Sequence, residues 1–133
     1  MKKFFFALLM ILACQATNLF AQSNKGANIQ FKKELYDYGN IKSGSKGYYE
    51  FKFTNTGTAP LRIADAKSSC GCLIAQWPKE AINPGDSSSI IAKYNTKIVG
   101  PISKSITVTS NALNKPTVIL RVKGNVVSPP ASN

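Results

Sequence analysis

Residues 48–53 read Tyr-Tyr-Glu-Phe-Lys-Phe, and this alternation is the strongest indication of the fold class. In an extended strand, successive side chains point to opposite faces, so the aromatic residues at the odd positions share one face while Glu50 and Lys52 lie on the other. The same period of two predicts strands at residues 29–35, 47–55, 61–67, 72–77, 87–95, 103–110 and 117–127. Seven half-buried strands in about 100 residues predict an all-β fold, an immunoglobulin-like antiparallel β-sandwich.

Turn-forming residues separate the expected strands. The sequence Asn83-Pro84-Gly85-Asp86 places proline where a type II turn fixes φ and glycine where the turn needs a positive φ. The last six residues, 128–133, have too little apolar content to pack, so we expect a flexible tail. The chain then divides into a linker at residues 22–28, one domain at residues 29–127, and this tail.

The first 21 residues have the features of a secretory signal peptide. A basic start at residues 2–3 precedes an apolar run at residues 4–13, and the small Ala21 offers a cleavage site. This run is shorter than the ~20 apolar residues that a membrane-spanning helix needs. We therefore expect a periplasmic or extracellular protein. The alternative is a lipoprotein anchored at Cys14, because a small residue directly precedes that cysteine.

The formal net charge is +11, and because two lysines lie in the expected leader, +9 remains after export (+11 − 2). Basic charge of this size can serve nucleic-acid or lipid binding. The lysines are dispersed over polar positions of alternating segments, as at Lys52, Lys93, Lys104 and Lys123. Together with export, this dispersal favours a solvated sheet face over a nucleic-acid site. A membrane contact is expected only for the form lipidated at Cys14.

The residue inventory excludes several kinds of active site. The chain contains no histidine, so a serine or cysteine nucleophile has no imidazole base, and zinc or blue copper has no imidazole ligand. The six acidic residues are scattered singly, which gives no support for a glycosidase pair. We expect no enzymatic activity and no cofactor.

Cys70 and Cys72, separated by Gly71, are the only cysteines after the leader. In a flat strand their Cα atoms would lie about 6.6–6.8 Å apart, at the outer limit for a disulfide, so a bridge requires a bend at Gly71. Closing so short a loop contributes only ~1.6 kcal/mol from chain entropy, so a bridge would be easily reduced. Three interpretations stay open: two small buried side chains, a redox-active dithiol, or a soft metal site suited to Cu(I).

Trp77 follows the cysteines closely and is the only tryptophan. Beside a loop it could stack on a ligand, and we keep it as a candidate ligand contact. The competing interpretation is that it caps the core of the sandwich, because a large apolar side chain is costly to leave in water.

A set of motifs covers nearly the whole chain after the leader: Tyr36-Asp37-Tyr38-Gly39, Phe53-Thr54-Asn55-Thr56-Gly57, Pro60-Leu61, Ser68-Ser69-Cys70-Gly71-Cys72, Pro84-Gly85, Tyr94 and Ser110-Asn111. This set resembles a family of bacterial secreted domains of unknown function, related to hydin-like and major-sperm-protein-like immunoglobulin folds. The chain has Leu73 where threonine is commoner in that family. The resemblance implies an immunoglobulin-like sandwich in the cell envelope, without an established activity.

Two classes of function follow from the sequence. The first is a non-enzymatic module of the bacterial cell envelope that binds a protein or a surface polymer through sheet edges and loops. The second is a thiol protein that acts through Cys70 and Cys72, by redox exchange or by binding Cu(I).

Overall fold

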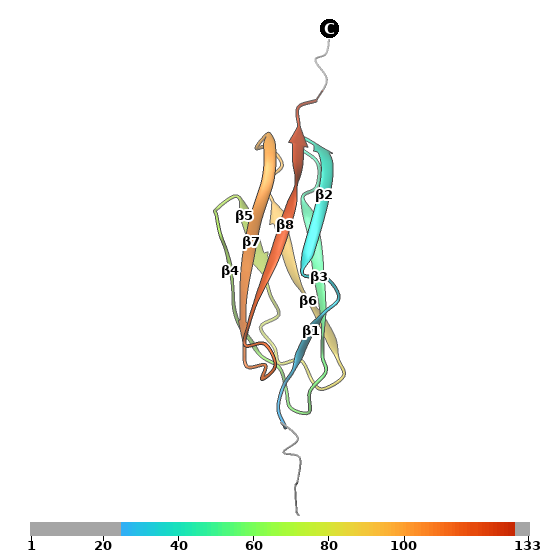
Figure 1. The fold of residues 1–133 in the computed structure, drawn as a ribbon, viewed down its shortest axis with the longest axis vertical. Helices are drawn as coiled ribbons and strands as arrows, with labels where there is room; N and C mark the ends of the chain where they lie inside the picture. The colour runs from blue at the N-terminus through green and yellow to red at the C-terminus, as the bar shows by residue number, and fades with distance from the viewer. Residues whose placement is uncertain (1–24, 130–133) are drawn as a thin grey trace, which may run out of the picture.

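The computed structural model describes residues 25–129, which form a sandwich of two four-stranded sheets (Figure 1). The strands are β1 (Ile29–Phe31), β2 (Leu35–Lys42), β3 (Tyr48–Asn55), β4 (Ile63–Ser68), β5 (Leu73–Gln76), β6 (Ser87–Tyr94), β7 (Gly100–Ser110) and β8 (Thr117–Val127). The expected all-β, immunoglobulin-like sandwich is confirmed. The expected leader, with its proposed cleavage site at Ala21 and the alternative lipid anchor at Cys14, lies outside the described residues. Within residues 25–129 no helix is long and apolar enough to cross a membrane.

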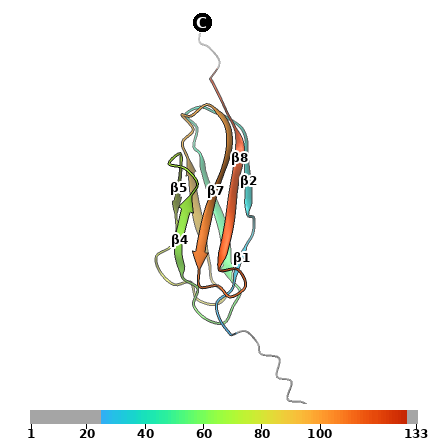
Figure 2. The ribbon, with the colours of Figure 1, turned by 60° about the vertical axis from the view of Figure 1, so that its left-hand side comes forward.

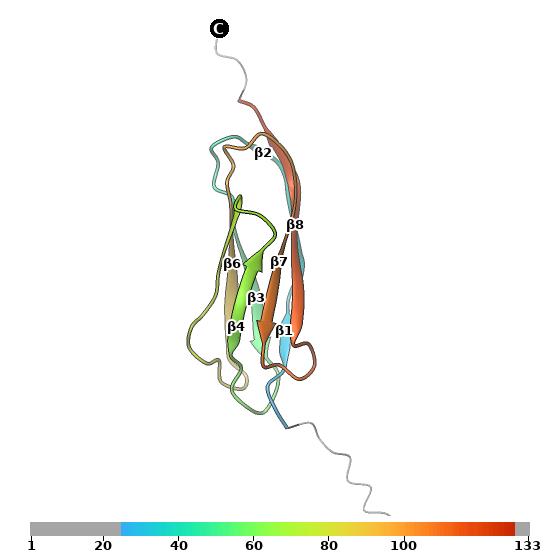
Figure 3. The same ribbon diagram turned by 90° about the vertical axis from the view of Figure 1, so that its left-hand side faces the viewer.

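The two sheets differ in strand direction. Sheet A has the order β1-β3-β6-β5, and its described pairs are all antiparallel. Sheet B has the order β2-β8-β7-β4 and is visible in Figure 2. In sheet B, β2 pairs parallel to β8, so the prediction of purely antiparallel sheets is wrong at this one pair. Figure 3 looks onto the edge of the sandwich at β4, where the two sheets are seen as facing layers.

The expected strand at residues 29–35 is present only as far as Phe31, because the chain changes sheets beyond that residue. β1 ends at Phe31 in sheet A, three exposed charged residues follow at 32–34, and β2 begins in sheet B. Within β2, Gly39 takes a positive φ of 65° and the register with β8 shifts between Asp37 and Asn40. This irregularity hides the alternation on which the strand prediction relied, and the sandwich therefore has eight strands rather than seven.

The core lies between the sheets and contains the residues that the alternation assigns to it. Phe51, Phe53 and Ile90 of sheet A are fully buried. Val108 and Leu120 of sheet B each have an exposed fraction of 1%. Burying an aromatic or branched aliphatic side chain contributes about 1.5–3 kcal/mol, so these residues supply much of the stability of the sandwich. The expected turn is also present, because Asp86 N donates to Asn83 O at 3.0 Å and Gly85 has a φ of 84°.

Asn55 is a buried polar residue at the end of β3. Its amide nitrogen donates to the carbonyls of Ala59 and Ile82 at 2.8 and 2.9 Å, and its amide oxygen accepts from the backbone N–H of Gly57 at 3.0 Å. These bonds satisfy loop groups that would otherwise be buried without a partner. The side chain thus fixes the connection from β3 toward β4.

The described chain enters the domain at one end of its long axis and leaves it at the other. β1 begins at one end of the long axis, and β8 finishes at the other (Figure 1). The start of β1 is held by Asn114, whose side-chain amide exchanges two hydrogen bonds with the backbone of Ile29, at 2.9 and 2.8 Å. The domain is therefore anchored at its entry by a loop that is distant in sequence.

Candidate functional site

The two cysteines lie in the connection between β4 and β5, which are edge strands of different sheets. A disulfide joins Cys70 to Cys72, and their Cα atoms are 5.3 Å apart. This distance lies inside the usual range for disulfides, whereas a flat strand would hold the two residues near its limit. The bend that the sequence requires is present, because residues 69–72 form a bend and turn before β5 begins at Leu73.

Backbone hydrogen bonds hold the connection to both sheets. Asn95 N, just beyond β6 in sheet A, donates to Cys72 O at 2.9 Å. Ser69 N donates to Ser105 O of β7 in sheet B at 2.9 Å, and the hydroxyl of Ser68 donates to Cys70 O at 2.8 Å. The connection is therefore fixed by more than the disulfide, and we expect the loop to keep its course when the cysteines are reduced.

Both cysteines are partly buried and pack against the core. Gly71 between them is exposed, its backbone lies outside the left-handed region, and an added Cβ would meet no atom within 4 Å. Across residues 25–129 no group of three or more Cys, His, Asp or Glu side chains gathers. The arrangement offers one dithiol pair in its oxidised state, and binding Cu(I) would first require reduction to two thiolates.

Trp77 lies beyond the far end of β5 from the cysteines. Five residues of extended chain span about 16 Å, so the structure does not bring Trp77 together with Cys72. The indole packs partly against the core, and the Lys79 ammonium lies 3.1 Å from its ring centroid. Such a cation–π contact already occupies one face of the ring. A shallow depression of about 270 Å³ beside it is lined partly by Ser88, Ser89 and Ile91.

A third feature, which the sequence did not reveal, is an open stretch of edge on β3. β1 pairs with β3 only from Phe53 to Asn55, and one further bond joins Lys32 N to Lys52 O at 2.9 Å. The chain then crosses to sheet B. Among residues 25–129, no strand pairs with residues 48–51 of β3 on this side.

The hydrogen-bonding phase of β3 shows which backbone groups are left open. Gly47 O and the N–H and C=O of Asn55 bond toward β6, whereas Lys52 O and Thr56 N bond toward β1 and the residue before it. Along a strand, the backbone N–H and C=O groups of successive residues point alternately toward one neighbouring strand and toward the other. Tyr48 and Glu50 therefore turn their backbone N–H and C=O groups toward the open edge.

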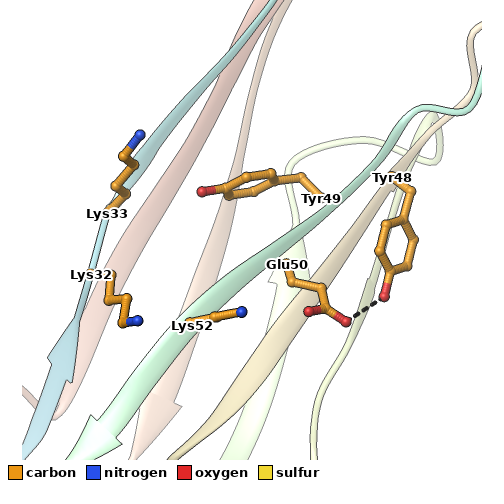
Figure 4. Close-up of a pocket in the computed structure, with 6 residues that line it drawn as sticks. All are labelled: Lys32, Lys33, Tyr48, Tyr49, Glu50 and Lys52. Atoms are coloured by element: carbon orange, nitrogen blue, oxygen red, sulfur yellow. Dashed lines mark hydrogen bonds between the residues drawn. The ribbon is translucent and has the colours of Figure 1, made fainter.

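A groove of about 490 Å³ lies along this open edge, and we call it the β3 edge groove (Figure 4). Its lining residues are Lys32, Lys33, Tyr48, Tyr49, Glu50 and Lys52. Figure 4 shows the Tyr49 ring projecting from β3 toward the segment that carries Lys32 and Lys33. Two consecutive lysines, Lys32 and Lys33, and the distant Lys52 thus surround one exposed stretch of backbone.

The one acidic residue of the groove is already engaged. The Tyr48 hydroxyl donates to the Glu50 carboxylate at 2.6 Å. This hydrogen bond, followed by burial and the carboxylate charge, raises the pKa of Tyr48 above its ordinary value. The bond occupies one carboxylate oxygen, and the three lysines leave the groove with an excess of positive charge.

Stacked aromatic rings form the floor behind the open edge. The rings of Tyr36 in β2 and Tyr49 in β3 are parallel, with centroids 3.7 Å apart, and Tyr38 meets Tyr36 edge-on at 4.9 Å. The Tyr38 hydroxyl donates to Gly47 O at 2.8 Å. Burial, with a smaller contribution from Tyr36, raises the pKa of Tyr38 to about 12. These contacts tie sheet B to sheet A where the strand crossing would otherwise leave a gap.

A model for the family described as protein of unknown function (DUF1573) matches residues 29–126. The chain belongs to the DUF1573 family. This result bears out the expectation of a family of unknown function, and the match runs from the first residue of β1 to the last but one of β8 in the DUF1573 domain. No curated protein matches the chain.

Solved structures similar to the DUF1573 domain share its fold at low sequence identity. A protein of unknown function from Porphyromonas gingivalis W83 has a TM-score of 0.69 at 19% identity, over 77% of this chain and 48% of that one. The chain thus spans about half the length of that protein. The ASH/PapD-like domain 7 of human CEP192 has a TM-score of 0.64 at 9% identity, over 86% and 96%. The YadV chaperone has a TM-score of 0.55 at 12% identity, over 79% and 55%.

The DUF1573 domain therefore presents two separate chemical features. One is the Cys70–Cys72 disulfide, which the sequence singled out. The other is the β3 edge groove, which depends on where β1 stops. The sequence does contain one indication of where β1 stops, the charged run at residues 32–34. Three consecutive charged residues interrupt the alternation of apolar and polar side chains that a half-buried strand requires.

Proposed function

We propose that this DUF1573 domain is an exported, non-enzymatic module of the bacterial cell envelope that binds another protein through a sheet edge. The observation that carries the proposal is the open stretch of β3, where the backbone groups of Tyr48 and Glu50 face outward. A free strand edge is a template for pairing with another chain, and proteins bind extended partners in this way. The leader at residues 1–21 supports a periplasmic or extracellular location.

The test is photocrosslinking in the producing cell with the full chain. A photoreactive phenylalanine analogue replaces Tyr48 in one variant and Lys67, on β4 at the opposite edge, in the other. We expect a defined crosslinked protein from position 48 and none from position 67. Equal crosslinking from both positions, or none from position 48, would refute a partner that binds at the β3 edge.

A second candidate function rests on the Cys70–Cys72 disulfide. A bridge that closes so small a loop is a labile one, and a labile bridge can exchange with partner thiols. Titration against a glutathione buffer measures its redox equilibrium, and Cu(I) titration of the reduced protein tests metal binding. Exchange or stoichiometric Cu(I) binding that is lost in Cys70→Ser/Cys72→Ser would support the thiol function. Neither activity in the wild type would remove it.

A further inference from the structure

We infer that the partner at the β3 edge groove is an extended, acidic segment that adds to sheet A as a further strand beside residues 48–51. The inference rests on the proposed function and names the chemical class of the partner. Its side chains alternate between apolar residues, which face Tyr49, and acidic residues, which face the lysines.

The backbone of the groove is prepared for a strand. β1 already pairs antiparallel with the far half of β3, and its last bond to β3, from Lys32 N to Lys52 O, lies where the open stretch begins. A segment that continues the line of β1 would meet the outward N–H and C=O groups of Glu50 and then of Tyr48.

The charge of the groove selects an acidic occupant. Lys32 and Lys52 lie beside each other at the end of β1, and Lys33 follows on the crossing segment (Figure 4). No ion pair within 4.0 Å joins any of these lysines to a carboxylate of the described residues. The Glu50 carboxylate accepts the Tyr48 hydroxyl, so carboxylates of the partner are placed best at the end of the added strand that lies next to Lys32 and Lys52. A basic segment would bring like charges together at close range.

The aromatic rings behind the open edge favour apolar side chains at the inward-facing positions of the partner. In an added strand every second side chain points inward, where the partly buried Tyr49 ring is stacked on Tyr36. An apolar side chain at this position removes ring surface from water. Alternation of apolar and acidic residues follows from the two faces that the groove presents.

The same lysines argue against a second copy of the chain as the occupant. Edge-to-edge pairing of two β3 strands would bring together two positively charged copies along an edge that carries Lys32, Lys33 and Lys52. Lysines on an exposed edge discourage such self-pairing. An acidic partner converts this repulsion into attraction.

The experiment measures peptide binding to the full mature chain by fluorescence anisotropy. The probe is a labelled, end-capped octapeptide of alternating valine and glutamate, with matched peptides that carry glutamine or lysine in place of glutamate. We expect the glutamate peptide to bind about tenfold more tightly than the glutamine peptide, and the lysine peptide not to bind. Raising the salt concentration should weaken the glutamate peptide selectively, because ions screen exposed charges.

Two further peptides test for a ladder. In one, the valine nitrogens are methylated, and in the other, the glutamate nitrogens. An added strand turns only one of these two sets toward β3, so one methylated peptide should bind like the parent and the other should not. Equal binding of both would show that no strand forms and would overturn the inference.

Protein variants test the lysines. Lys32→Glu/Lys33→Glu should weaken the glutamate peptide about tenfold or more, whereas Arg62→Glu/Lys67→Glu has the same change in net charge near the opposite edge and should leave affinity within about twofold. Glu50→Gln removes the nearby negative charge and should raise affinity about two- to threefold. Circular dichroism checks that each variant keeps its β structure.

The experiments distinguish a failure of the acidic-strand inference from a failure of the proposed protein-binding function. If crosslinking from position 48 succeeds but all three peptide classes bind alike or fail to bind, the acidic-strand inference is overturned while the protein-binding function stands. If sedimentation shows that the wild type dimerises and Lys32→Glu/Lys33→Glu abolishes the dimer, the occupant is a second copy and the inference is wrong. Loss of the position-dependent crosslink removes the proposed function itself.

Discussion

Asn55 shows how one side chain can determine a loop. Its amide donates to two carbonyls and accepts from Gly57 N, in a site where the residue is fully buried. An asparagine followed by threonine and glycine indicates only a break in the strand. The sequence does not reveal that this amide is buried, because burial depends on Ile82, which lies far along the chain.

Asn55→Ala should lower the free energy of unfolding by on the order of 3 kcal/mol, since several backbone groups would lose their partner while remaining buried. Urea unfolding monitored by circular dichroism measures this loss. Asn95→Ala is the matched control, because the exposed Asn95 side chain accepts one bond from Lys97 N at 3.1 Å. A loss for Asn55→Ala no larger than the control's would show that water replaces these bonds.

The raised pKa of Tyr38 predicts that the domain loses stability at alkaline pH. Its pKa is about 12 in the folded domain, against an ordinary value of 10.0, so the fold favours the neutral phenol. The resulting stabilisation is complete below pH 10 and is lost as the pH rises toward 12. Tyr38→Phe should cost about 0.5–1.5 kcal/mol at pH 8, where Gly47 O loses its donor, and should show a flatter decline above pH 10. Parallel pH curves for wild type and variant would contradict this assignment.

At the scale of elements, the connection from β4 to β5 keeps its conformation without the disulfide that it carries. Backbone hydrogen bonds from Asn95 N to Cys72 O and from Ser69 N to Ser105 O hold this connection without the cysteine side chains. Cys70→Ser/Cys72→Ser should therefore fold with unchanged β-type circular dichroism and lose about 1.6 kcal/mol or less, below the 2–5 kcal/mol typical of a structural disulfide. Gly71→Ala is the control in the same loop and should stay within about 0.5 kcal/mol of the wild type. A double variant that fails to fold would make the pair structural.

Alternation along single strands was enough to predict most elements, and contacts between distant strands explain the failures. The buried faces of β3, β6, β7 and β8 follow the period of two, so their positions and inward residues were predictable. β2 was not, because Gly39 and the register shift interrupt its pattern and its partner β8 lies at the far end of the chain. The Cys70–Cys72 pair was recognisable from spacing. The β3 edge groove was not, because it exists only where β1 leaves the sheet.

At the scale of the whole molecule, the expected leader bears on the charge and the location of the protein. Cleavage after Ala21 is expected, and it removes Lys2 and Lys3, so the exported chain carries +9 of the original +11 (+11 − 2). Intact-mass measurement of the exported protein, together with N-terminal sequencing, checks the cleavage site. A lipid-modified Cys14 at the N-terminus would instead establish the anchored form.

The position of the chain ends has a mechanical consequence. β1 starts and β8 finishes at opposite ends of the long axis, so a pull between residues 25 and 129 loads both strands lengthwise, in shear (Figure 1). β8 has ten register partners on β7, whereas β1 has three on β3. Rupture should therefore begin at β1, with the amide of Asn114 as its clamp. Single-molecule pulling should show a small early step that Asn114→Ala weakens, and a single step unchanged by that substitution would place the mechanical weak point elsewhere.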